Sequence, residues 1–467
     1  MQTSSQSDAA TEPGMSLPTG TAASTDVESF SGRVVILFGS SVVTTGIAIV
    51  IGFLLARVLG PSGKGDYYLA TQLPVTVMVL LQLGLPQAFG YFAARGQTRG
   101  LAAKTVVLTT VLCVPALLAI VALMPILRAT VLHGLDPFLV LLGIAVLPVM
   151  LNATYTTGII LARGVVGPYA AVSIGQVVVS FILFMVVVGL LGGGLVAALW
   201  ITLAVAILAP IGYFLIAARA TAAVVDAAPV SYRELLSFGL PLYPGSITQY
   251  FSLRVDVYIL AWVLADPSAP LGFYSMAVTM AQLLFFLPNA VSQIFFPHVA
   301  GSTREESDRQ VAVVARVTLL ITTTGAILLV PVATVLIHLL LPAFVDSLPA
   351  FYLLLPGVVA LSLTKVLSSY VAGVGRTSAI SWINIGALVL NVVANLVLIP
   401  PYGIVGAAAS SLISYAASAV AFSVLAARLA SGSAVDFWSP RGSDVRFAIA
   451  TGIGLGRRVL RRAEIRG

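Results

Sequence analysis

The chain has 467 residues, of which 59% are hydrophobic and only 9% are charged, and its formal net charge is +7. A water-soluble protein needs far more surface charge, so this composition excludes soluble enzymes and binding domains and predicts an all-α protein with many membrane spans. The single cysteine, Cys113, excludes an intrachain disulfide and a thiolate metal cluster.

A polar segment precedes a long series of apolar stretches. The first 31 residues hold four acids and no base, so they lack the pattern of a signal peptide and predict a disordered cytoplasmic tail over residues 1–32. A helix needs about 20 apolar residues to cross a bilayer. Stretches that reach this length lie at 34–57, 68–94, 103–127, 137–161, 169–190, 195–218, 238–264, 273–297, 312–340, 349–372, 379–399 and 404–427. We therefore expect twelve transmembrane helices.

The basic residues between these stretches predict how the chain faces the membrane. Connections after even-numbered stretches hold Arg95, Arg99, Lys104, Arg163, Arg219, Arg233, Arg304, Arg309, Arg316 and Arg376. Those after odd-numbered stretches hold only Arg57, Lys64 and Arg128. Because positive charge accumulates on the cytoplasmic side, both termini are expected in the cytoplasm, and the RRVLRR run at 457–462 agrees with this.

Two halves of the sequence resemble each other. LARVLGPSGKGDYYLA at 55–70 matches LAWVLADPSAPLGFYSMA at 260–277 in its Pro, Ser, Gly and Tyr positions, with short insertions. GLLGGGLVAALW at 189–200 matches IPPYGIVGAAAS at 399–410 at a similar spacing. Six helices bring the chain back to its starting side, so the repeats are expected to be parallel lobes with a cleft between them. The alternative is chance similarity among helices rich in Ala, Val, Leu and Gly.

The expected domains follow from this repeat. Residues 33–219 form an N-terminal six-helix lobe, residues 220–428 form a C-terminal six-helix lobe, and residues 429–467 form a basic cytoplasmic tail. The tail is either a topology anchor or a surface for anionic lipid headgroups.

The two repeated hairpins resemble those of a known family. LARVLGPSGKGDYYLA with the later GLPQAFGYFAAR at 84–95 resembles the first hairpin of Wzx-type polysaccharide flippases. FGLPLYPGSITQYFSLRVDVYILAWVL at 238–264, followed by LGFYSMAVTMAQLLFFLPNAVSQIFFPHVA, resembles the start of their second half. The resemblance implies a transporter that moves polyprenyl-pyrophosphate-linked oligosaccharide from the cytoplasmic to the outer leaflet.

The seventh stretch carries two opposite charges, Arg254 and Asp256, with Gln249 just before them. A rise of about 1.5 Å per residue places Arg254 roughly 24 Å along this helix from Phe238, where an ionised group costs a few kcal/mol unless it has a partner or faces water. The two charges lie about 200° apart on a continuous helix, so each must find another partner. In one account both lock helix packing; in the other Arg254 meets a pyrophosphate in the cleft and Asp256 tunes it or binds a coupling ion.

Other polar groups within the spans are candidates for the same cleft. Lys365 either snorkels to the surface or faces the cleft, and Asn384 and Asn391 share one helix face as interhelical hydrogen-bond partners or sugar contacts. Pro241 and Pro244 are the expected kink or hinge of the seventh helix.

We therefore expect a flippase that works by alternating access in a bacterial inner membrane and supports surface polysaccharide (O-antigen, capsule or exopolysaccharide) biosynthesis. Its expected partners are the lipid-linked oligosaccharide, membrane lipids, a polysaccharide polymerase and glycosyltransferases, with no nucleic acid. The sequence contains no nucleotide-binding P-loop and predicts no cofactor, no metal and no enzymatic activity. The alternatives are a multidrug exporter of the same fold, which would need an acidic or aromatic cleft, and a membrane polymerase, which would need catalytic groups on a large outer loop.

Overall fold

The structure is a computed structural model that describes residues 20–130, 132, 135–222, 229–439, 441–442 and 444. Within these ranges the chain is helical and has no β-strand. The predicted tail over residues 1–32 is too long, because the first helix already begins at Gly20; a nucleated span extends easily through residues that tolerate helix. Residues 1–19 and the RRVLRR run lie outside the described residues.

The helices of the first half follow one another with short connections. They are α1 Gly20–Leu81, α2 Leu85–Ala94, α3 Leu101–Thr130, α4 Pro137–Ile144, α5 Leu147–Ala162, α6 Val166–Leu183, η1 Phe184–Leu190 and α7 Leu195–Ala222.

The second half begins with a broken helix and ends with a long bent one. Its elements are α8 Tyr232–Gly239, η2 Leu240–Leu242, α9 Tyr243–Ser252, α10 Val255–Val263, α11 Ser268–Gln282, η3 Leu283–Phe285, α12 Phe286–Gly301, α13 Arg304–Leu340, η4 Pro342–Ser347, α14 Leu348–Gly373, α15 Thr377–Leu429 and η5 Ala434–Phe437.

Nine helical segments of the described chain are long and apolar enough to cross a membrane. Two of them, Gly39–Leu81 and Thr377–Leu429, each contain a residue with non-helical dihedral angles, Gly60 (φ 66°) and Gly403 (φ 55°), where the chain reverses and crosses again. The crossing made by α8, η2, α9 and α10 is divided into pieces that are individually short. Twelve crossings in the described residues result, as predicted.

The connection predicted between the first two apolar stretches, over residues 58–67, is shorter than expected. Only Gly60 leaves the helical conformation, and the next helix starts at Pro61, whose fixed φ and missing N–H suit a first helical position. Lys64 and Gly65 therefore lie in the first turns of the second crossing and not in a loop.

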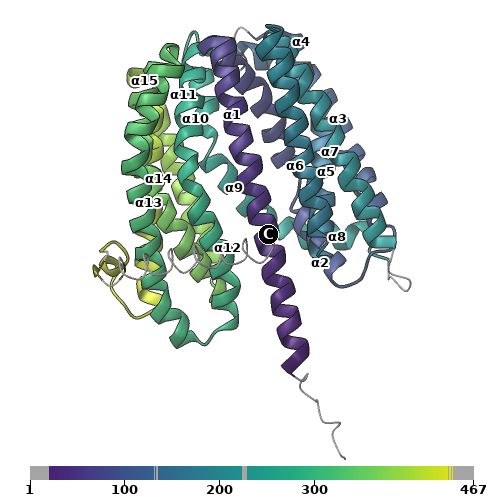
Figure 1. Ribbon diagram of the computed structural model, residues 1–467, viewed down its shortest axis with the longest axis vertical. Coiled ribbons are helices and arrows are strands. Elements are labelled where there is room, and N and C mark those ends of the chain that lie inside the picture. The colour runs from purple at the N-terminus through teal and green to yellow at the C-terminus, as the bar shows by residue number, and fades with distance from the viewer. Residues whose placement is uncertain are drawn as a thin grey trace, which may run out of the picture.

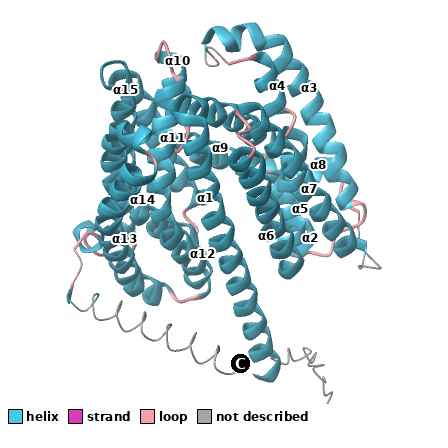
Figure 2. Ribbon diagram, turned by 45° about the horizontal axis from the view of Figure 1, so that its top comes forward, coloured by secondary structure: helices cyan, strands magenta, loops and turns pink. Residues whose placement is uncertain are grey.

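The crossings form two groups with α1 between them (Figures 1 and 2). We call the end that contains the turns at Gly60 and Gly403 the hairpin end, which is the top of Figure 1. The opposite end contains the connections at 95–100, 163–165 and 302–303, and we call it the arginine end.

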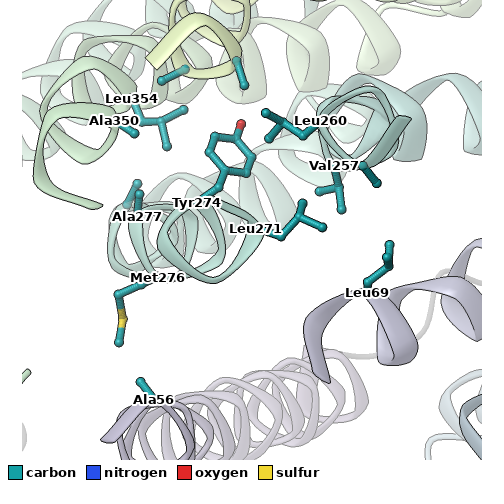
Figure 3. Packing of buried hydrophobic residues seen from close by; sticks show 14 of the residues in the cluster. Ala56, Leu69, Val257, Leu260, Leu271, Tyr274, Met276, Ala277, Ala350 and Leu354 are labelled. Carbon is teal, nitrogen blue, oxygen red and sulfur yellow. The ribbon is translucent and has the colours of Figure 1, made fainter. Parts of the chain in front are cut away.

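The buried core differs between these two ends. At the hairpin end a single cluster includes residues of both lobes, such as Ala56 and Leu69 from α1 and Val257 and Leu271 from the second half (Figure 3). At the arginine end the first lobe has a core around Phe89 and the second lobe has a separate one. The buried core is therefore shared by both lobes at the hairpin end and consists of separate clusters at the arginine end.

The repeated sequences meet at this junction. A methyl group on Gly65 would overlap the carbonyl oxygen of Ser268, and one on Gly272 would overlap that of Pro61. The two glycines occupy matching positions of the repeat, so each half places its glycine against the backbone of the other. Only a residue without a side chain permits so close an approach. Asp66 adds a polar contact across the junction, because its Oδ1 accepts a hydrogen bond from the Ser268 hydroxyl at 2.6 Å.

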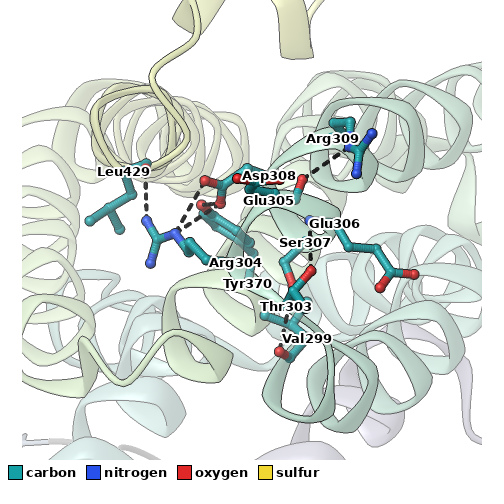
Figure 4. A network of polar contacts seen from close by, with 10 residues as sticks. All are labelled: Val299, Thr303, Arg304, Glu305, Glu306, Ser307, Asp308, Arg309, Tyr370 and Leu429. Atoms are coloured by element: carbon teal, nitrogen blue, oxygen red, sulfur yellow. Dashed lines mark hydrogen bonds and ion pairs between the residues drawn. The ribbon is translucent and has the colours of Figure 1, made fainter.

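At the arginine end, polar contacts tie together the helices of the second lobe (Figure 4). Arg304 donates to the Leu429 carbonyl at 2.5 Å and forms an ion pair with Asp308 at 3.0 Å. The Tyr370 hydroxyl donates to the same carboxylate. These contacts join α13, α14 and α15 at this end of the second lobe.

The chain after α15 packs against the same lobe. We call residues 430–444, as far as they are described, the strap. Phe437 is buried in the core of the second lobe, and the Asp444 carboxylate accepts hydrogen bonds from Arg316 at 2.6 and 3.3 Å. Arg316, which the sequence placed among the cytoplasmic loop residues, thus lies inside α13 and is neutralised by the strap.

Candidate functional site

The seventh crossing is interrupted at Arg254. Helix α9 ends at Ser252 and α10 begins at Val255, and Arg254 between them has φ −141° and ψ −10°. The expectation that Arg254 and Asp256 lie about 200° apart on one continuous helix is therefore wrong. The break lets the two side chains take directions that a regular helix would not allow.

Arg254 reaches from the second lobe to the first. Its Nη1 donates a hydrogen bond to the hydroxyl of Tyr68 on α1 at 3.1 Å, and the side chain is half-buried. Leu253 lines the central cavity, whereas Arg254 itself is not among the lining residues. The guanidinium thus lies at the junction of the lobes, beside the cavity.

Asp256 is enclosed within the second lobe and is only 4% exposed. Its carboxylate accepts hydrogen bonds from the Val257 N–H at 2.8 Å, from Ser411 Oγ at 3.3 Å and from the Tyr274 hydroxyl. These donors belong to α10, α15 and α11. A carboxylate with three donors is the arrangement that offsets the cost of burying a charge, so Asp256 holds three helices together.

Tyrosine hydroxyls of the seventh crossing bind the second crossing along its length. Tyr250 and Thr76 share a hydrogen bond of 2.6 Å, Tyr258 donates to the Gln72 carbonyl at 3.1 Å, and Tyr243 donates to the Leu80 carbonyl. Near the arginine end, α8 even packs into the core of the first lobe, because Leu235 belongs to that cluster. The predicted lobe boundary at residue 220 therefore does not describe α8.

A cavity of about 820 Å³ opens between the lobes. Each lobe contributes one cation to its lining, Lys64 from the first and Lys365 from the second. Gln176, Gln282 and Asn289 add amides. Hydroxyls come from Thr45, Tyr67, Ser180, Thr202, Tyr213 and Thr279. The described residues that line the cavity include no Asp or Glu.

The two lysines differ in their surroundings. Lys64 is 8% exposed and its Nζ lies 5.7 Å from the centre of the Tyr67 ring, while Lys365 is half-buried. Among the described residues neither ammonium group has a hydrogen-bonded or ion-paired partner in the protein. A charge at membrane depth is tolerated where a water-filled cavity reaches it.

The other predicted residues divide between surface and core. Gln249 is exposed and Asn384 is half-buried, and neither lines the cavity. Asn391 is 1% exposed and donates to Ser414 Oγ at 2.9 Å, which matches an interhelical hydrogen bond.

The predicted prolines lie where the seventh crossing loses its regular helix. Pro241 lies in η2, and Pro244 lies in the first turn of α9. Their role as a hinge stays a prediction.

Lys64 is a cavity-lining cation that the sequence does not single out, because its place after the first apolar stretch predicts an outer connection. A signal was present in the repeat, where the position before each matching glycine holds Lys64 in one half and Leu271 in the other. Within the described ranges, no group of three or more His, Cys, Asp or Glu side chains is placed to hold a metal ion.

Comparisons with known proteins agree with this architecture. The profile of a family described as polysaccharide biosynthesis protein matches residues 33–302, more than half of the chain. No curated protein sequence matches.

Several solved structures share the fold. An inward-facing multidrug resistance transporter of the MATE family, within the MOP superfamily, has 15% sequence identity and a TM-score of 0.66, and the match covers 83% of this chain and 94% of that one. The lipid II flippase MurJ in an inward closed conformation has 12% identity and a TM-score of 0.67, with 90% and 93% covered. A MOP-superfamily transporter from Pyrococcus furiosus, whose binding pocket is described as reversed in polarity, has 15% identity and a TM-score of 0.54, with 85% and 95% covered.

Proposed function

The chain belongs to the polysaccharide biosynthesis protein family and has the fold of the MOP-superfamily transporters, and we propose that it is a flippase for an anionic, lipid-linked oligosaccharide. The observation that carries this proposal is the cavity between the lobes, which has one lysine from each lobe and no carboxylate among its described lining residues.

The chemistry of the lining supports such a cargo. Ammonium groups bind phosphate oxygens through charge-assisted hydrogen bonds, and amides and hydroxyls match the donors and acceptors of sugars. A polyprenyl pyrophosphate carries both an anionic group and a glycan, while its apolar tail stays in the lipid. Transport of this kind needs positioning and movement and no bond making, so no catalytic group is required.

The arrangement of the lobes supports alternating access. The lobes share a core at the hairpin end and have separate cores at the arginine end, so cargo enters from the arginine end. The basic residues at that end support a cytoplasmic position for it, with the protein in the inner membrane of a bacterium. Enzymes that build the lipid-linked saccharide would supply the cargo, and a polymerase on the other side would consume it.

Lys64 and Lys365 are proposed to contact the anionic group, and Arg254 is proposed to hold the lobes in register beside it. The test uses purified protein in liposomes that contain a fluorescent undecaprenyl-pyrophosphate saccharide, with the flipped fraction measured by quenching of the outer leaflet. Lys64→Met/Lys365→Met should lose most of the flipping, since each charged hydrogen bond contributes about 1.5–3 kcal/mol. Arg376→Met removes an exposed charge at the arginine end and should flip as the parent protein does.

The rival function, export of lipophilic drug cations, is tested in the same liposomes with ethidium. A cationic cavity repels this dye, so we expect no protein-dependent uptake or release. Transport of ethidium without flipping of the saccharide would overturn the proposal in favour of a multidrug exporter.

A further inference from the structure

The first turn of the second crossing combines the cavity and the junction of the lobes within three residues. Lys64 lines the cavity, Gly65 packs against the Ser268 carbonyl of the other lobe, and Asp66 accepts the hydrogen bond of the Ser268 hydroxyl. Lys64 is therefore separated from the hairpin-end contact by less than one helical turn.

The two halves of the repeat carry different residues at the position before the matching glycines. Gly65 and Gly272 occupy matching positions and pack in the same way, but the residue before each glycine differs. Leu271 is 1% exposed and contributes to the core that joins the lobes. In the first lobe this position holds a lysine that faces the cavity. A buried apolar residue stabilises closure of the hairpin end in any state, whereas a lysine makes closure depend on what the cavity contains.

The direction of this dependence follows from desolvation. With the hairpin end closed, Lys64 as a whole residue is 8% exposed, and its ammonium group has no hydrogen-bonded partner among the described residues. Burial of an unpaired charge is unfavourable, and an anion in the cavity removes this cost. Opening of the hairpin end would instead expose the same turn to water.

We propose that Lys64 is the residue that couples cargo to the hairpin-end closure, so that an anion in the cavity stabilises the closed hairpin end and an empty cavity favours its opening. This inference rests on the proposed function, because it requires an anionic cargo. By linkage, the affinity for cargo is therefore higher while the hairpin end is closed and falls when it opens.

The test measures the distance across the hairpin end with spin labels on Val58→Cys and Ala265→Cys, two exposed positions on opposite lobes, in a Cys113→Ala background. The probe is inorganic pyrophosphate, with sodium chloride at matched ionic strength as the control. In the parent protein pyrophosphate should increase the short-distance population. Lys64→Met should show mostly short distances without pyrophosphate and no response to it.

Lys365→Met is the matched variant, because it removes the other cavity cation but leaves the first turn of the second crossing intact. It should need roughly tenfold more pyrophosphate for the same shift in distance, and its distance distribution without pyrophosphate should equal that of the parent.

Calorimetric measurement of pyrophosphate binding distinguishes failure of the coupling from failure of the anionic-cargo proposal. Binding to the parent protein without any change in distance, or identical distances in Lys64→Met and the parent, would overturn the coupling alone. Absence of binding to the parent would overturn the anionic cargo as well.

Discussion

Arg254 is a charged residue at the junction between the two lobes. The side chain is held by the Tyr68 hydroxyl of the opposite lobe at 3.1 Å, where the seventh crossing is broken. A hydrogen bond from a charged donor contributes about 1.5–3 kcal/mol, more than a neutral one. At this site the contact acts between lobes, so its loss should change transport more than the stability of either lobe.

We predict that Arg254→Met and Tyr68→Phe each reduce flipping roughly tenfold, because either one removes the same contact between the lobes. The double variant should be no worse than either single one, as in a double-mutant cycle for two interacting residues. The measurement is the flipping assay, with protein amount and unfolding temperature as controls. If Tyr68→Phe flips normally while Arg254→Met does not, Arg254 acts on the cargo and not through Tyr68.

The sequence shows which charged residues are costly to place in a membrane span, but it does not show where their side chains point. Hydropathy identifies Arg254, Asp256 and Lys365 as costly groups that need partners, and all three have either a partner or the cavity. It cannot show that the helix breaks at Leu253 and Arg254, because no Pro or Gly marks that point. Lys64 was missed for the opposite reason, since the Gly and Pro around it predict a loop where the structure has only a single non-helical glycine.

At the scale of elements, the seventh crossing links the lobes because its successive pieces pack against different parts of the molecule. Its first helix, α8, packs into the first lobe, and α10 packs into the core that both lobes share. The interruptions at η2 and Arg254 divide this crossing into short pieces, which would let the pieces turn relative to one another if the predicted hinge operates. Tyr250 and Tyr258, which donate to or share hydrogen bonds with the second crossing, are then the contacts that must change when the lobes move.

The glycine contact gives a prediction about the second crossing. Gly65→Val should prevent closure of the hairpin end, because its side chain would overlap the Ser268 carbonyl. The spin-label distances between Val58 and Ala265 should then be long with or without pyrophosphate, and flipping should fall by at least tenfold. Gly46→Val lies in the first crossing, with open space around its Cβ position, and should behave as the parent does. Short distances in Gly65→Val would mean that the close approach is not needed for closure.

The strap gives a second prediction, about pH. The Arg316 hydrogen bond lowers the pKa of the Asp444 carboxyl below its ordinary value of 3.8. A lowered folded-state pKa means that the pair stabilises the strap above pH 3.8 and that this stabilisation is lost as the pH falls through the lower value. Both side chains are buried, at 5% and 3% exposure, so removal of one partner costs about 3–5 kcal/mol.

Asp444→Asn should therefore release the strap at neutral pH, where the parent strap stays bound. Acrylamide quenching of Trp438, with the other three tryptophans replaced by Phe, should rise in this variant and should no longer change at acidic pH. Asp436→Asn is the control, since its pair with Arg441 is exposed, at 44% and 60%, and such pairs contribute little. Equal quenching in both variants would show that the ion pair does not hold the strap.

At the scale of the molecule, the lengths of the apolar stretches were enough to predict twelve crossings, and the internal sequence repeat predicted two similar lobes. The hydrophobic effect in a bilayer leaves few alternatives for a chain of this composition. The lobes' relative arrangement could not be predicted, because it depends on contacts between small residues, such as Gly65 and Gly272, that carry no hydropathy signal. A repeat shows that two halves fold alike but does not show at which end they touch.

The orientation of the whole molecule is the last prediction, and the direction of transport depends on it. The excess of arginine and lysine at the arginine end predicts that this end faces the cytoplasm. Because the cores of the two lobes are separate there, the structure would then represent the state that loads from the cytoplasm.

Single cysteines at Ala265 and Thr377, both exposed and at opposite ends, allow a direct measurement of this orientation in the Cys113→Ala background. In intact spheroplasts an impermeant maleimide should label Ala265→Cys fully and Thr377→Cys only after permeabilisation. The reverse pattern would place the open end outside, and a cargo made in the cytoplasm would then meet the closed end of the protein.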